Sequence, residues 1–93
     1  MKKYELMAIY PLEDEKAKKG AEDLKNALST FGAEIVEEKP FGDRDLTYEI
    51  KKHKKGRFVL YTLKCNPSKI VEIEKIFKIN MNLLKTQFVR IDE

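Results

Sequence analysis

Two amphipathic helical segments, each lying between stretches of strand character, constrain the fold of this chain most. From Leu12 to Phe31, apolar residues recur at spacings of four, three, four and three, which is typical of one face of a helix. Gly32 follows, where a left-handed C-terminal cap is expected. Asn66 and Pro67 predict the start of a second helix, an N-cap residue followed by proline at the first helical position. That helix should run to about residue 79, and its expected apolar face is Ile70, Ile73, Ile76 and Phe77.

The remaining segments alternate in polarity or are rich in β-branched and aromatic residues, both typical of strands. A break is expected within the second strand, because PFGDRD (residues 40–45) contains a proline and a glycine that permit a bend, a bulge or a loop. KKHKKG (residues 51–56) is expected to form a turn. The predicted strands are Lys3–Tyr10, Glu34–Lys39 with Leu46–Lys51, Arg57–Cys65 and Leu84–Ile91.

The order β, α, β, β, α, β predicts an α+β, ferredoxin-like sandwich, a four-stranded antiparallel sheet with two helices on one face and the other face open. Right-handed crossovers place the first and third strands side by side at the centre, where we expect them to run parallel, flanked by the second and fourth. The sequence has no internal repeat or linker, and 93 residues support only one core, so residues 1–93 are expected to be a single domain.

Charge and composition narrow the class of protein. Charged residues make up 38% of the chain, and no apolar run approaches the ~20 residues that a membrane span needs, so we expect neither a membrane protein nor a secretory signal, and we place the chain in the cytoplasm. Residues 1–46 contain eight Lys/Arg and eleven Asp/Glu, a net charge of −3, whereas residues 47–93 contain eleven and five, a net charge of +6. This asymmetry can create a positive surface that attracts phosphate, or it can be an ordinary solvated charge run.

Catalytic and metal chemistry have little support in the sequence. Cys65 is the only cysteine and cannot form an internal disulfide, and the single histidine, His53, lies among lysines that would repel a cation. Because no nucleophile–base pair or Gly-rich phosphate loop is present, we expect no enzyme, no cofactor and no small-molecule substrate. Acyl-phosphate or nucleotide chemistry, which small ferredoxin-like domains can host, is the enzymatic alternative.

In a sheet covered on one side only, a strand is expected to be polar on its other face, but the third strand is apolar on both faces. If Val59 and Tyr61 pack under the helices, Phe58 and Leu60 lie on the open face, near Met7 and Ile9. Such a patch indicates a binding surface, for stacked bases or for another protein, unless a local loop covers it. A protein is favoured, because only Phe58 offers an aromatic surface there. We therefore predict that the partner protein contacts Met7, Ile9, Phe58 and Leu60.

Basic residues are concentrated immediately before this strand, where five of seven residues are Lys or Arg. At the end of a hairpin they could meet phosphates at the rim of the patch. The predicted phosphate-contacting group is Lys51, Lys52, Lys54, Lys55 and Arg57.

The string GDRDLTYEIKKHKKGRFVL combines a Gly-x-Arg element, a Leu-x-Tyr-x-Ile strand, a basic turn and a Gly-x-aromatic strand. In this order it resembles the signature of the bacterial small-subunit ribosomal protein six family, as do the opening KKYELMAIY and the closing FKINMNLLKTQFVRIDE. The resemblance implies a structural, non-catalytic protein, monomeric before assembly, of the small-subunit platform. It would bind the central domain of small-subunit (16S) rRNA together with ribosomal protein eighteen.

By position, the resemblance adds Lys2, Lys3, Arg44 and Arg90 as candidate rRNA contacts. The chain departs from the family pattern in that Asp45 follows Arg44, Thr47 and Glu49 replace the common Ala and Pro around Tyr48, and Arg57 stands where an aromatic is usual. Asp45 could pair with Arg44 or repel the RNA backbone. An RNA-independent protein-interaction or regulatory module, with lysines serving solubility, is the alternative function.

Overall fold

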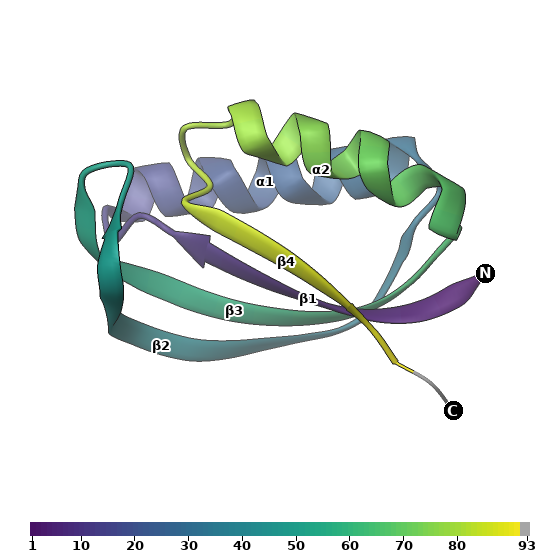
Figure 1. The fold of residues 1–93 in the computed structure, drawn as a ribbon, viewed down its shortest axis with the longest axis horizontal. Coiled ribbons are helices and arrows are strands. Elements are labelled where there is room, and N and C mark those ends of the chain that lie inside the picture. Colours follow the sequence, from purple (N-terminus) through teal and green to yellow (C-terminus); the bar gives the residue numbers. More distant parts are fainter. Residues whose placement is uncertain (92–93) are drawn as a thin grey trace.

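Both helices cover the same face of a single antiparallel sheet, and the other face is free of secondary structure, as the ferredoxin-like prediction requires (Figure 1). The computed structural model describes residues 1–91. The elements are β1 (Lys2–Tyr10), α1 (Asp14–Thr30), β2 (Glu34–Ile50), β3 (His53–Cys65), a short 3-10 turn η1 (Pro67–Lys69), α2 (Ile70–Ile79) and β4 (Lys85–Arg90).

The strand order is β2-β3-β1-β4, so β1 and β3 lie at the centre as predicted. The expectation that they run parallel is wrong, because Lys2 faces Cys65 at one end of the pair and Tyr10 faces Arg57 at the other. Each helical crossover leads to a parallel strand two places away, not to the adjacent strand. β3 returns from β2 through a hairpin and is therefore antiparallel to β2 and to β1.

The second strand is continuous through PFGDRD, and of the bend, bulge or loop expected there the structure has a bulge. Phe41 is an extra residue between Pro40, which faces Val59, and Gly42, which faces Phe58. Gly42 has φ +86°, a left-handed conformation that glycine adopts without steric cost. Because β2 is an edge strand, the missing N–H of Pro40 does not interrupt the sheet.

The hairpin between β2 and β3 turns in only two residues. Lys51 and Lys52 have φ values of 48° and 69°, and Ile50 pairs with His53 on either side of them. Turns with two left-handed residues match the right-handed twist of paired strands. The predicted turn over residues 51–56 is therefore wrong for residues 53–56, which belong to β3.

The core lies between the sheet and the helices. The predicted face of α1 is confirmed, with Ala17, Leu24 and Leu28 buried, and so is the Asn66 cap, whose Oδ1 accepts a hydrogen bond from the Ser68 N–H at 3.1 Å. In α2, Ile73 and Phe77 are buried, but Ile76 is 39% exposed, contrary to expectation. Ile73 and Phe77 are four residues apart and point to the sheet, which leaves Ile76 on the flank of the helix.

Candidate functional site

The centre of the open face carries the predicted apolar strip. Met7 faces Leu60 and Ile9 faces Phe58 across the β1–β3 pair. Met7, Phe58 and Leu60 are partly exposed, as a contact surface requires. Ile9, which the sequence placed in the same surface, is only 6% exposed, because it lies against Gly56, where a Cβ atom would overlap the Ile9 Cγ2.

The last part of β2 forms a wall beside this strip. The β2–β3 hairpin, at the left of Figure 1, bends out of the sheet towards the level of the helices. Leu46, Tyr48 and Ile50 line a hollow of about 330 Å³ whose other side includes Met7 and Phe58. Sequence reasoning missed these three residues, although the alternation Leu-x-Tyr-x-Ile places them on one face of a strand.

A second hollow, of about 320 Å³, extends the strip towards β4. It is lined by Glu5, Met7, Leu60, Gln87 and Val89. Val89 is 51% exposed, and Glu5 gives this half of the open face an acidic group. The strip therefore continues across β1, β3 and β4 as one surface suited to contact with another macromolecule.

Arg44 lies on the open face, above two aromatic rings. Its guanidinium carbon is 5.8 Å from the centre of the Phe41 ring and 6.0 Å from that of Phe58. Asp45 lies 3.8 Å from the Lys55 ammonium, so its ion pair is with the lysine across the hairpin. The bulge at Phe41 brings an aromatic side chain, 39% exposed, to this surface, which the sequence alone did not indicate.

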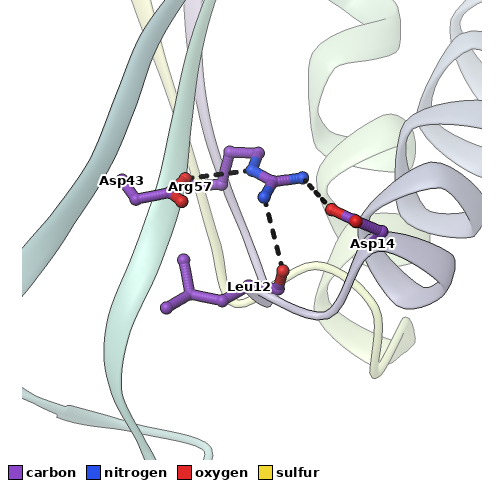
Figure 2. A network of polar contacts seen from close by, with 4 residues as sticks. All are labelled: Leu12, Asp14, Asp43 and Arg57. Carbon is purple, nitrogen blue, oxygen red and sulfur yellow. Dashed lines mark hydrogen bonds and ion pairs between the residues drawn. The ribbon is translucent and has the colours of Figure 1, made fainter.

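Arg57 points to the helix side of the sheet and is held by three oxygen atoms (Figure 2). Its Nε donates to Asp43 Oδ1 at 2.9 Å, its Nη1 donates to Asp14 Oδ1 at 3.1 Å, and its Nη2 approaches the Leu12 carbonyl oxygen at 3.4 Å. The hydrogen bonds to Asp43 and Asp14 raise the pKa of the guanidinium. In this structure Arg57 joins β3 to β2 and to the start of α1.

The five basic residues of the predicted phosphate-contacting group therefore differ in their surroundings. The Lys51 ammonium donates to the carbonyl oxygens of Asn80 and Leu83, at 3.0 and 2.7 Å, and burial lowers its pKa. Lys52 and Lys54 are exposed, and their side chains have no ion pair or hydrogen bond within residues 1–91. Two of the five thus present an ammonium group that no protein atom holds.

The other predicted RNA contacts lie at the opposite end of the sheet. Lys2 and Lys3 begin β1, Arg90 ends β4, and Tyr4 pairs with Arg90 because the two strands are antiparallel. Figure 1 shows the start of β1 and the end of β4 towards one side of the molecule and the hairpin on the other. Lys64, which faces Lys3 and is exposed, adds a cation that sequence reasoning did not include.

Metal-binding geometry is absent from the described part of the chain, which has no group of three or more His, Cys, Asp or Glu residues suitably placed. Cys65 is buried, and burial raises the pKa of its thiol. None of the helices described is long and apolar enough to cross a membrane.

Comparison with known proteins adds the decisive observation. A model of the family described as ribosomal protein S6 matches residues 3–90. The chain belongs to the ribosomal protein S6 family. As a member of the S6 family it has a structural, non-enzymatic ribosomal role. The match confirms the family that the sequence motifs suggested.

Its relatives include the small ribosomal subunit protein bS6 of Treponema denticola, 45% identical over 93 residues and covering all of both chains. The bS6 of Treponema pallidum is 34% identical over 92 residues, or 99% of each chain. In fold, this S6 family member matches the crystal structure of 30S ribosomal protein S6 from Thermotoga maritima with a TM-score of 0.84, at 22% identity, over 97% of this chain and 87% of that one. The C-terminal domain of MgtC from Mycobacterium tuberculosis also matches, with a TM-score of 0.64 and 7% identity, so the fold alone does not indicate function.

Proposed function

We propose that the chain is a structural constituent of the small ribosomal subunit that binds the central domain of 16S rRNA together with ribosomal protein eighteen. Residues 1–93 act as one domain, monomeric before assembly, and associate with the ribosome in the cytoplasm. The observation that carries the proposal is the apolar strip on the open face, bordered by a hairpin with exposed lysines.

The strip supports contact with a protein. Met7 pairs with Leu60 across the β1–β3 ladder, Phe58 lies two residues before Leu60 on the same face of β3, and the hollows on either side can receive apolar side chains. Partly exposed apolar residues gathered on one sheet face stabilise a complex when a partner removes them from water. Ile9 lines the same hollow as Met7 and Phe58, but it is only 6% exposed, so we assign it lower weight as a contact.

The exposed cations support contact with RNA. Lys52 and Lys54 at the hairpin, and Arg44 above its aromatic rings, present positive charge at one edge of the strip. Lys2, Lys3 and Arg90 remain candidates for a second contact at the other end of the sheet. Lys51 and Arg57 belong to the predicted group, but their donors already bind protein oxygens, so we assign them lower weight as phosphate contacts.

The test is binding of the purified protein to a central-domain rRNA fragment, with and without ribosomal protein eighteen, between 50 and 200 mM salt. Neutralisation of ~4 phosphates predicts about a hundredfold loss of affinity over that range. Binding that strengthens with the partner and weakens with salt supports the proposal. Absence of RNA binding under both conditions would contradict it and favour the RNA-independent interaction module.

A further inference from the structure

Along the wall of the larger hollow of the open face, the regular register between β2 and β3 is interrupted. β2 and β3 pair regularly up to Asp45 and Lys55, and the next pair is Ile50 with His53. Four residues of β2, 46–49, therefore face a single residue, Lys54, on β3. The regular ladder that orients the rest of β2 is therefore interrupted along this segment.

Lys51 supplies a different anchor at the tip of the hairpin. Its ammonium bridges the carbonyl oxygens of Asn80 and Leu83 in the loop between α2 and β4. Asn80 is the C-cap of α2, where unpaired carbonyl oxygens give the helix end a partial negative charge that favours a cation. Burial of the ammonium, which lowers its pKa, agrees with a side chain directed into the protein.

The loop that receives Lys51 is itself held firmly. Asn80 Nδ2 donates to Asp23 Oδ2 of α1 at 2.9 Å, and Asn80 Oδ1 accepts from the Asn82 N–H at 2.8 Å. Leu83 is 1% exposed, and the N–H of Leu84 donates to the Ile9 carbonyl oxygen of β1 at 2.7 Å. The hairpin tip is thus attached to a point that both helices and the central sheet fix.

We propose that Lys51 is a positioning residue for the partner-binding face. By anchoring the hairpin tip it holds Leu46 and Tyr48 beside Met7 and Phe58, and so keeps the larger hollow in a shape that a partner side chain can enter. The effect on partner binding rests on the proposed function, whereas the effect on the hairpin does not. Lys51 then acts through the protein fold, and Lys52, its neighbour, acts on RNA.

Hydrogen–deuterium exchange of the free protein tests the anchor. Lys51→Met keeps the length of the side chain and removes its donors, so the amides of residues 45–55 should exchange about tenfold faster, while β1 keeps its protection. Lys52→Met is the matched control and should leave hairpin exchange unchanged. Lys51→Arg, which keeps the charge and the donors, should restore most of the protection. If K51M loses protection across β1 as well, Lys51→Gln is compared in its place.

Binding measurements then separate the two lysines. K51M should weaken binding of ribosomal protein eighteen about tenfold and leave the salt dependence of RNA binding unchanged, whereas K52M should lower that salt slope by ~1 and leave partner affinity unchanged. Unchanged hairpin exchange in K51M overturns the inference, and faster exchange with unchanged partner affinity overturns its link to the partner. If the unaltered protein binds no partner, the proposed function fails, and the exchange comparison still decides the role of Lys51.

Discussion

Arg57 and Asp43 face each other across the β2–β3 ladder, and the Arg57 Nε atom lies 2.9 Å from Asp43 Oδ1. The same guanidinium lies 3.1 Å from Asp14 Oδ1 at the start of α1. The Arg57 guanidinium therefore offsets the negative charge of both carboxylates and connects the β2–β3 pair to the start of α1. An arginine that looked from the sequence like part of a basic RNA-binding stretch has a structural task.

Arg57→Gln should lower the free energy of unfolding by at most about 1 kcal/mol, because these ion pairs are partly exposed to solvent. It should not reduce the salt dependence of rRNA binding, since the guanidinium is already committed to carboxylates. Lys54 lies three positions after Lys51 and takes part in neither the Lys51 nor the Arg57 contacts. Lys54→Gln should therefore reduce that slope by ~1 without changing stability. Urea unfolding measures the stability of each variant, and a salt series of binding measurements gives the slope. An equal loss of slope in the two variants would mean that Arg57 contacts RNA.

Replacing Phe58 and Leu60 together with serine should abolish binding of ribosomal protein eighteen and leave the fold intact. Both side chains keep part of their apolar surface exposed in the free protein, and a partner can remove that remaining surface from water. Val71→Ser is the control, because Val71 lies on α2 and is 60% exposed, and this variant should bind normally. Calorimetry measures binding of the partner, and circular dichroism checks the fold of each variant. Unchanged binding by the double variant would show that the partner does not bind the open face.

Gly20→Ala should destabilise the protein although alanine favours helices. A Cβ atom at position 20 would overlap the carbonyl oxygen of Asn82 and lie 3.0 Å from Tyr10 Cδ1, so backbone must move. Overpacking costs roughly 1–3 kcal/mol, which exceeds the gain of about 1 kcal/mol from helix propensity. At exposed Lys18 in the same helix, the Ala variant should instead be more stable than the Gly variant. Denaturant unfolding of the two pairs measures both signs.

Asp23 should contribute stability that depends on pH. The hydrogen bond from the Asn80 amide, together with Lys19, lowers the pKa of this carboxyl, so the folded state binds the proton less readily than the unfolded chain. The contribution is present above the ordinary Asp pKa of about 3.9 and disappears as pH falls through the lower folded value. Asp23→Asn should thus cost up to about 1 kcal/mol at neutral pH and progressively less as pH falls below about 3.9. Thermal unfolding across pH tests this, with exposed Glu22→Gln as the control; a pH-independent difference would contradict it.

Local patterns were sufficient for most of the fold. The spacing on α1, the Asn66 cap and the alternation of β1 depend on neighbours in the chain, and each was found where expected. The length of the turn was not, because KKHKKG contains no Asn-Gly or Asp-Gly pair to mark a two-residue hairpin. Likewise, Ile9 has the same alternation as Met7, yet it lies against Gly56 and is buried, which alternation cannot predict.

The order of elements, the apolar strip on one strand and the concentration of positive charge all follow from residue type and spacing along the chain. Which cations face solvent depends instead on tertiary packing. Lys51 and Lys52 are adjacent and chemically identical, yet one reaches the carbonyl oxygens of Asn80 and Leu83 and the other does not. The reason is physical: the acceptors lie about thirty residues further along the chain, and their position is set by how the hairpin, the helices and β4 pack together.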